Sequence, residues 1–315
     1  MAKGFRRPGR GNLYVVSGRG TAMRVLVTGG TGFLGSRVCQ VLADRDHDVI
    51  ALARSPGDGS LPAAVTRRAA DVTDFNDLAD HFADVDAVVN LVSLSPLYKP
   101  PRGLTHEGVH LDGTENCVRA AMEHDVEKIV QISGLGADPT GRTAYIRAKG
   151  RAERVVRDAD LAHTIVRPSV VFGEGGEFVS FVEKLTTPYV TGLPAGGRTR
   201  FQPIWVEDIA PMVAGCIEPD HDGETYEIGG PERLSLADVT RLVWGARGKG
   251  VTIIPIPLPL AKLGLVIADP LPFIPFGADQ GRSLEMDNVT DENAVDVFGV
   301  DPADLRTLAD YLDTR

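Results

Sequence analysis

Cysteine is scarce in this 315-residue sequence, and spacings typical of metal ligands are missing from it. The three cysteines, Cys39, Cys117 and Cys216, are scattered and odd in number, and none belongs to a CxxC pair. This pattern argues against a disulfide framework or a zinc site and favours a reducing compartment, which we expect to be the cytoplasm. Positive charge is also in short supply. The formal net charge of -10 disfavours nucleic acid as a general partner.

Long uninterrupted apolar runs are missing as well. The most apolar stretch, Val251–Phe276, is broken by six prolines, which rules out one straight membrane-spanning helix. Two interpretations remain open for it. The preferred one is a buried or domain-capping segment, and the other is a hydrophobic hairpin that touches a membrane or a partner protein.

The first 22 residues differ in composition from the rest of the chain. They are rich in glycine, carry five Lys or Arg residues and no acidic residue, and contain no apolar run long enough for a signal peptide. We expect residues 1–22 to be a disordered leader or a consequence of start-site choice, with Met23 as the true start. A basic tail that binds polyanions is the alternative.

The chain is 43% hydrophobic, enough for one large domain with a smaller lobe.

A glycine-rich turn follows the first apolar run, Arg24–Thr28. Gly29, Gly32 and Gly35 form a GxxGxxG pattern that opens into a helical segment. Strand, glycine turn and helix come in the order that a dinucleotide-binding loop requires. Gly29 would permit the tight turn, Gly32 the close approach of a pyrophosphate, and Gly35 the packing of helix on strand. The phosphates would lie on free N–H groups at the helix start. A plain turn is the alternative.

The second apolar run, Val49–Ala53, ends at the position that contacts the adenosine ribose in dinucleotide-binding folds. An acidic residue there accepts a hydrogen bond from the 2′-hydroxyl of NAD, whereas an arginine pairs with the 2′-phosphate of NADP. Arg54 occupies this place, and no acidic residue follows until Asp58. We therefore expect NADP as the cofactor, with NAD as the alternative. The alternative interpretation is that Arg54 is an ordinary surface residue. Asp71-Val72, after the third strand, would flank the adenine.

Apolar runs and amphipathic segments alternate along the chain. Strands are expected at 24–28, 49–53, 65–70, 86–92, 126–133, 162–166 and 224–228, and helices at 36–43, 74–82, within 103–123, and at 143–158, 178–185 and 235–246, with tail helices near 291–297 and 302–312. This alternation predicts an α/β fold, a Rossmann-type doubly wound parallel sheet. The NAD(P)-binding domain is expected at 23–172, with returning elements near 203–230. A smaller, interleaved C-terminal lobe would comprise 173–202 and 231–315.

Tyr145 and Lys149 are four residues apart on the predicted helix 143–158 and therefore share one face. Ser133 ends the preceding strand, at the edge of the sheet where a nicotinamide would lie. Hydride transfer to a carbonyl needs a proton donor at the oxygen, and a free phenol has a pKa of about 10. Lys149 would favour the phenolate and bond the nicotinamide ribose, while Ser133 would hold the substrate oxygen. A chance helical pair of tyrosine and lysine is the alternative.

Together these motifs resemble the short-chain dehydrogenase/reductase superfamily, in its extended or atypical branch of NAD-dependent epimerase/dehydratase-like proteins. The matching segments are Thr28–Gly35, Asp71-Val72, Ser133, Tyr145-x-x-x-Lys149, Arg167–Gly173 and Val206–Ala210. The resemblance implies an NAD(P)-dependent oxidoreductase or epimerase-like enzyme for a small molecule, with Ser133, Tyr145 and Lys149 as catalytic residues. The candidate cofactor-binding residues are Gly29, Thr31, Gly32, Phe33, Leu34, Gly35, Arg54, Asp71, Val72, Leu91, Tyr145, Lys149 and Pro168.

Within that branch, the chain is similar to the group of the nucleotide-binding accessory subunit of respiratory complex I and its prokaryotic relatives. The similarity lies in Ala278–Ser283, Asp287–Val289 and Phe298–Pro302. The eukaryotic subunit is taken to hold NADPH without turning it over. The resemblance therefore implies a second function, a non-catalytic NADPH-holding accessory or assembly protein that contacts a membrane or the respiratory complex through Val251–Phe276.

One residue departs from the superfamily pattern. His110 stands where many members have an asparagine that supports a proton relay. Its ring nitrogen can take over that role, or the residue can be purely structural. The departure favours the second function, whereas the intact Ser133, Tyr145 and Lys149 set favours the enzyme.

Overall fold

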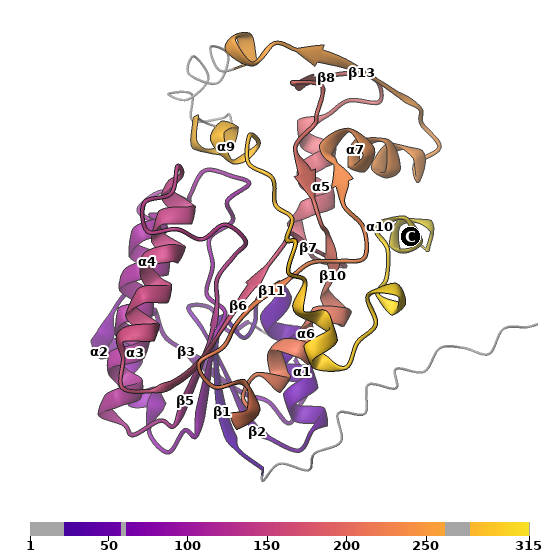
Figure 1. Ribbon diagram of the computed structural model, residues 1–315. Helices are drawn as coiled ribbons and strands as arrows, with labels where there is room; N and C mark the ends of the chain where they lie inside the picture. Colours follow the sequence, from indigo (N-terminus) through magenta and orange to yellow (C-terminus); the bar gives the residue numbers. More distant parts are fainter. Residues whose placement is uncertain (1–21, 58–60, 262–277, 315) are drawn as a thin grey trace, which may run out of the picture.

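The computed structural model describes residues 22–57, 61–261 and 278–314 (Figure 1). The predicted leader, apart from Ala22, and residues 262–276 of the apolar segment lie outside these ranges. The centre of the molecule is a seven-stranded sheet of order β11-β6-β5-β4-β1-β2-β3, with every neighbouring pair parallel. Its strands are β1 (Arg24–Thr28), β2 (Asp48–Ala53), β3 (Thr66–Ala69), β4 (Ala87–Asn90), β5 (Lys128–Ile132), β6 (Ala162–Pro168) and β11 (Thr225–Ile228).

The central strands are apolar because helices cover both faces of the sheet. All residues of β4 and β5 are buried, and Val25, Leu26 and Val27 of β1 are fully inaccessible. The strand order reverses direction between β1 and β4, and ligands of such sheets bind at this switch, outside the carboxyl ends of the strands. The predicted doubly wound parallel sheet is confirmed.

Helices flank the sheet on its two faces (Figure 1). These elements are α1 (Phe33–Asp44), α2 (Phe75–Leu78), the 3₁₀ turn η1 (Ala79–Phe82), the π-helical turn η2 (Glu107–Asp112), α3 (Gly113–Glu123), α4 (Ala144–Asp158) and α6 (Val206–Gly215). Helices α1 and α6 share one apolar cluster that includes Val38 and Ile209, whereas Cys117 of α3 and Val156 of α4 belong to the cluster on the opposite face. The loops at the carboxyl edge of the sheet are therefore held from both sides.

The lobe lies over that edge and has its own core (Figure 1). It packs Phe178, Phe181, Leu193, Leu236 and Leu308 into one apolar cluster. The remaining elements of the described residues are β7 (Val171–Phe172), α5 (Glu177–Leu185), β8 (Tyr189–Pro194), β9 (Arg200–Phe201), β10 (Ile204–Trp205), η3 (Pro219–His221), β12 (Leu234–Ser235), α7 (Leu236–Gly245), β13 (Val251–Ile256), α9 (Ala278–Ser283), η4 (Ala294–Phe298), η5 (Pro302–Asp304) and α10 (Leu308–Asp313).

The bounds of several expected elements need correction. The helix expected within 103–123 is present as α3, and a π-helical turn precedes it. The tail helix expected near 291–297 is the short 3₁₀ turn η4, and the one expected at 302–312 is divided into the 3₁₀ turn η5 and the helix α10. The predicted strands 86–92 and 126–133 end early, at Asn90 and Ile132, so that Leu91 and Ser133 lie in the turns beyond β4 and β5. Helical and strand periodicity place an element well but define its ends poorly.

The apolar segment is not buried where the structure describes it. Its first part forms β13, which pairs only with β8, and Ile254 and Leu260 are 51% and 62% exposed. None of residues 251–261 is buried, so the burial part of the preferred interpretation is wrong for them. Ile253 still packs against the core of the lobe, as a domain-capping segment would. Across the three described ranges, no helix combines the length and the apolar composition needed to cross a bilayer.

Candidate cofactor and substrate site

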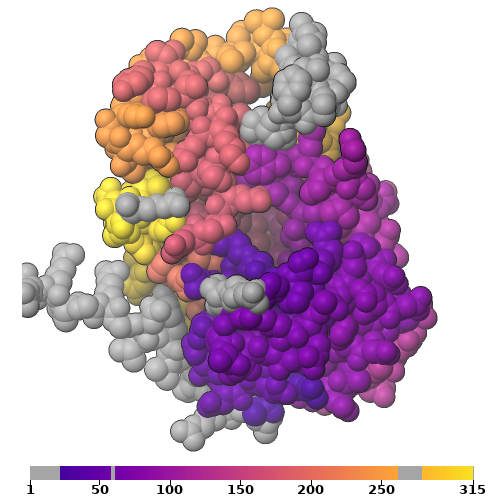
Figure 2. All heavy atoms as spheres, turned by 180° about the vertical axis from the view of Figure 1, so that it is seen from behind, coloured from indigo at the N-terminus to yellow at the C-terminus, as the bar shows by residue number. Residues whose placement is uncertain are grey.

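A cavity of about 930 Å³ lies between the carboxyl edge of the sheet and the lobe. Figure 2 shows the hollow between the indigo and purple elements of the sheet and the red elements of the lobe. Every predicted site residue lies on the wall of this cavity except Lys149. Folding therefore brings these separate motifs of the sequence to one surface.

The glycine turn is shaped by close backbone contacts. Gly29 has a positive φ of 73°, and the N–H groups of Gly29 and Gly30 donate to the carbonyl oxygen of Leu52, at 2.8 and 3.2 Å. A methyl group added at Gly35 would lie 2.1 Å from the Gly29 carbonyl oxygen. Only glycine allows helix α1 to begin this close to the turn.

The start of α1 is open to an anion. Its N-cap is Gly32, no side chain caps it, and its first turn carries no acidic residue. Uncapped N–H groups and the helix dipole attract a phosphate group at this position. The glycine turn and the uncapped helix start thus fit the pyrophosphate of a dinucleotide.

The adenosine end of the wall carries one basic and one acidic residue. Arg54 follows β2 and is exposed. Asp71 accepts hydrogen bonds from the Thr73 backbone N–H at 2.9 Å and the Thr73 hydroxyl at 2.8 Å, which fixes the turn after β3. Val72 is buried beside it. This end of the cavity thus combines an exposed guanidinium group with an ordered acidic turn.

Tyr145 is held by the first turn of α4. Thr143 caps this helix by accepting from the Ile146 N–H at 3.2 Å, and Asp279 of α9 accepts from the Ala144 N–H at 2.9 Å. A methyl group added at Gly134 would be 2.9 Å from the Tyr145 hydroxyl. This hydroxyl therefore lies close to the backbone that follows Ser133. Burial raises the pKa of Tyr145 to about 12, and the Ser93 side chain opposes this shift.

Lys149 lies below the cavity wall. Its side chain is 1% exposed, its ammonium donates to the Ile132 carbonyl at 2.8 Å, and its nitrogen is 6.0 Å from the centre of the Tyr145 ring. Burial lowers the pKa of Lys149 to about 7, although the Glu153 carboxylate opposes this shift. The structure thus places Lys149 near the phenol but not on the surface that a cofactor would touch.

Ser133 and Glu153 form a buried polar pair that the sequence reasoning missed. The Ser133 hydroxyl donates to Glu153 at 2.5 Å, and Glu153 is 1% exposed. Arg167 donates to both Glu153 oxygens, at 2.8 and 2.7 Å, and Arg157 donates at 3.0 Å. Glu153 is four residues after Lys149 and shares its helix face, and this spacing could have indicated that Glu153 lies near the candidate catalytic residues. The hydroxyl proton of Ser133 is therefore hydrogen-bonded to Glu153 and does not point into the cavity.

Two histidines pack on Tyr145. The His106 and His110 rings stack with 5.6 Å between their centres, and both meet the Tyr145 ring edge to face, at 5.6 and 5.4 Å. His110 Nε2 accepts from the Leu94 N–H at 3.3 Å. Within the described part of the chain, Nδ1 of each histidine is buried and has no hydrogen-bond partner. His110 therefore holds the loop after β4, which lines the cavity, and a structural role accounts for its presence.

The protonation of His110 is expected to make stability depend on pH. Burial, then Lys149 and His106, lowers the pKa of His110 well below 6.5. As the pH falls below about 6.5, the His110 ring takes up a proton in the unfolded chain before it does so in the folded chain. The free energy of unfolding therefore decreases as the pH falls, by up to about 1.4 kcal/mol per pH unit. His110→Asn should reduce this slope in urea unfolding between about pH 7 and about pH 5. An unchanged slope would contradict the assignment.

Comparison with known proteins agrees with this geometry. A protein-family model described as NAD(P)H-binding matches residues 29–191, more than half of the chain. The chain belongs to this NAD(P)H-binding family. The match begins at the glycine turn, just after β1, and covers β2 to β6, the Tyr145 helix and α5. No group of three or more His, Cys, Asp or Glu side chains that could hold a metal occurs among the described residues of this family member.

Several individual proteins are similar to the chain in sequence or in fold. The chain is 28% identical to the mitochondrial NADH dehydrogenase [ubiquinone] 1 alpha subcomplex subunit 9 of Arabidopsis thaliana, over 92% of this chain and 75% of that protein. It is 30% identical to a 2-alkyl-3-oxoalkanoate reductase of Stenotrophomonas maltophilia, over 49% of this chain and 53% of that protein. The UDP-glucose 4-epimerase of Thermus thermophilus, solved with NAD, has the same fold, with a TM-score of 0.66, 21% identity and coverage of 92% and 97%. The predicted resemblance is confirmed.

Proposed function

We propose that the chain is an NADPH-dependent oxidoreductase that reduces a carbonyl group, with Tyr145 as the proton donor. The observation that carries this proposal is the position of the Tyr145 phenol on the cavity wall, beside the carboxyl end of β5. A pKa of about 12 keeps the phenol protonated at neutral pH, as a donor must be. Bound NADPH would supply the hydride.

Lys149 and Ser133 have supporting roles in this proposal. A protonated Lys149, 6.0 Å from the Tyr145 ring, favours the phenolate that forms when the phenol gives up its proton. Ser133 donates to Glu153, so it can hold a substrate oxygen as a donor only after that hydrogen bond opens. The Lys149 ammonium gives one of its three N–H groups to Ile132, and it reaches a cofactor ribose only if its buried side chain moves to the cavity wall. Tyr145 is therefore the residue on which the chemistry depends.

A second function has its own support. Ser133 and Lys149 are both engaged away from the cavity, which suits a protein that holds NADPH without turning it over. The similarity to a subunit of mitochondrial NADH dehydrogenase points the same way. In this case the exposed ribbon of β8 and β13 would contact a respiratory complex or a membrane.

Turnover separates the two functions. Purified protein is mixed with NADPH and a panel of neutral ketones and quinones, and NADPH consumption is followed by absorbance, while binding is followed by fluorescence. An oxidoreductase consumes NADPH in step with the acceptor. Tight NADPH binding without consumption by any acceptor would favour the holding function.

Arg54 is proposed to select NADPH over NADH. Arg54→Ala is expected to weaken NADPH binding about 10- to 100-fold, because a charge-assisted contact to the 2′-phosphate contributes about 1.5–3 kcal/mol. NADH binding should stay unchanged. Arg68→Ala is the matched control, since Arg68 is exposed on the adjacent β3 but does not line the cavity. Equal loss for both cofactors in fluorescence titrations would contradict this role.

A further inference from the structure

We propose that the lobe half of the cavity takes an uncharged, largely hydrocarbon carbonyl compound and excludes sugar nucleotides. The lobe half is the wall formed by Leu97, Phe178, Phe181, Phe201, Leu284 and Met286. The proposal rests on the proposed carbonyl reduction, because it names the class of molecule that the same site would reduce.

The lobe half is apolar and rigid at its base. Phe178, Phe181 and Phe201 are 2%, 1% and 4% exposed and belong to the core of the lobe. Leu97 and Leu284 pack against that core from two different segments. Preformed pockets lined in this way bind ligands through apolar surface and use a few polar groups to orient them.

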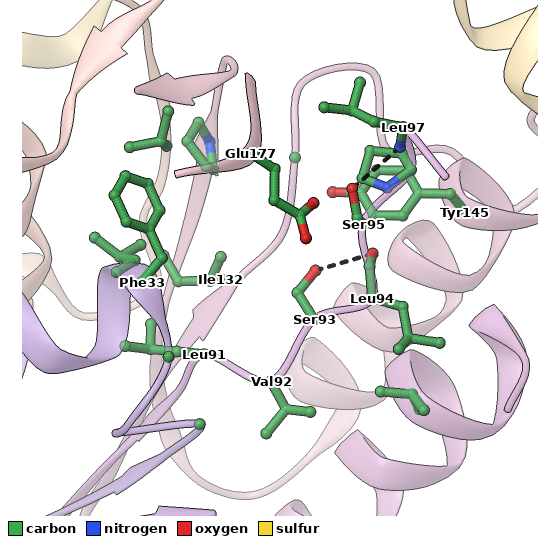
Figure 3. Close-up of a pocket in the computed structure, with 18 of the residues that line it drawn as sticks. Phe33, Leu91, Val92, Ser93, Leu94, Ser95, Leu97, Ile132, Tyr145 and Glu177 are labelled. Carbon is green, nitrogen blue, oxygen red and sulfur yellow. Dashed lines mark hydrogen bonds between the residues drawn. The ribbon is translucent and has the colours of Figure 1, made fainter. Parts of the chain in front are cut away.

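The charges on the wall are unfavourable for a diphosphate. Among the described residues, Arg54 is the only lysine or arginine on the wall, and it follows β2, three strands away from β5, or roughly 14 Å. The lobe half has Glu177 and Asp287 instead, and Figure 3 shows Glu177 pointing into the cavity toward the Ser93–Ser95 loop. The pyrophosphate of a sugar nucleotide would be repelled by the Glu177 carboxylate and would find no basic side chain on this part of the wall, so it would be disfavoured there.

Arg200, the basic residue next to Phe201 in the chain, is already paired. Arg200 donates to Asp287 through Nε at 2.8 Å and Nη2 at 2.6 Å. Both nitrogens donate to one Asp287 oxygen, and the pair neutralises Asp287, which leaves Glu177 as an exposed carboxylate on this wall. A neutral ligand meets no such penalty.

The polar groups on this part of the wall are mostly used within the protein. The Ser95 hydroxyl accepts from the Leu97 N–H at 3.3 Å, the Ser93 hydroxyl donates to the Leu94 carbonyl at 3.5 Å (Figure 3), and Gln280 donates to the Tyr98 carbonyl at 3.1 Å. A ligand oriented by the Tyr145 phenol and otherwise held by apolar contacts fits these surroundings. A single carbonyl oxygen on a hydrocarbon frame meets that description.

Calorimetry tests the proposal without requiring turnover. The full chain, alone and with NADP⁺ present, is titrated with 2-undecanone and with UDP-glucose at several temperatures. We expect 2-undecanone to bind with a negative heat-capacity change, the mark of buried apolar surface, and UDP-glucose to bind at least about tenfold more weakly. Failure of 2-undecanone to bind in either form, or tighter binding of UDP-glucose, would overturn the proposal.

Two variants of one wall residue sharpen the test. Met286→Glu places a charge in the lobe half at a partly buried position, and Met286→Leu keeps the side chain apolar. The first is expected to weaken 2-undecanone binding at least about tenfold and the second to change it less than about twofold, because a buried charge without a partner is costly. Thermal melting of both variants verifies that they fold. Unchanged binding by folded Met286→Glu would overturn the proposal.

The outcomes for substrate class and for function are distinct. A protein that binds 2-undecanone but never consumes NADPH with any acceptor would retain the substrate class and lose the proposed function. A protein that consumes NADPH only with nucleotide-bound sugars would retain the function and lose the substrate class.

Discussion

Tyr145→Phe is expected to lower kcat for NADPH-dependent carbonyl reduction by about 10²- to 10⁴-fold, the usual contribution of a positioned proton donor. The substitution removes one hydroxyl group and keeps the ring that packs on His106 and His110. Binding of NADPH should therefore persist within about twofold, as measured by fluorescence titration. Steady-state kinetics with the best acceptor give the loss in kcat.

A matched control separates chemistry from general effects. Tyr189→Phe also removes one phenol hydroxyl, but Tyr189 is 66% exposed on the lobe and lies outside the cavity wall. This variant should keep the activity of the original protein. If Tyr145→Phe retained full activity, the proton donor would have to be another group and the proposed mechanism would be wrong.

Glu153→Ala is expected to lower the free energy of unfolding by about 3–5 kcal/mol, the cost of removing one partner from a buried ion pair. Glu153 is 1% exposed and accepts hydrogen bonds from Ser133, Arg167 and Arg157. Among the described residues, its loss would leave the half-buried Arg167 with its longer contact to Glu227, at 3.3 Å. Urea unfolding followed by circular dichroism measures the change.

An exposed ion pair provides the comparison. Glu123 pairs with Arg119 at 2.8 Å, and both side chains are about half exposed. Glu123→Ala should cost less than about 1 kcal/mol, since solvent screens such pairs. Similar losses for the two variants would show that the Glu153 cluster contributes no more than a surface contact.

The fold was predictable because its signals are local. Apolar runs of strand length alternate with amphipathic segments, and the glycine turn sits between the first strand and the first helix. Gly35 shows how direct such a signal is, since any side chain there would collide with the Gly29 carbonyl. The place of Arg54 on the cavity wall followed from strand order in the same way.

The orientation of the catalytic candidates was not predictable from spacing. The four-residue separation of Tyr145 and Lys149 gave a shared helix face, yet Tyr145 reaches the cavity and Lys149 donates to Ile132 beneath it. Burial also sets their pKa values, at about 12 and about 7. Neither the hydrogen-bond partner nor the degree of burial is contained in the separation of two residues along a helix.

The amino-acid sequence by itself determined the parallel sheet and the glycine turn between its first strand and first helix, because strand and helix periodicity and glycine geometry act between residues close in the chain. Only the tertiary structure decided that Ser133 bonds Glu153, that Ile254 and Leu260 are exposed, and that Glu177 and Met286 line the same cavity as Tyr145. These outcomes depend on which distant segments pack against one another, and a side chain chooses its partner only after that packing is in place.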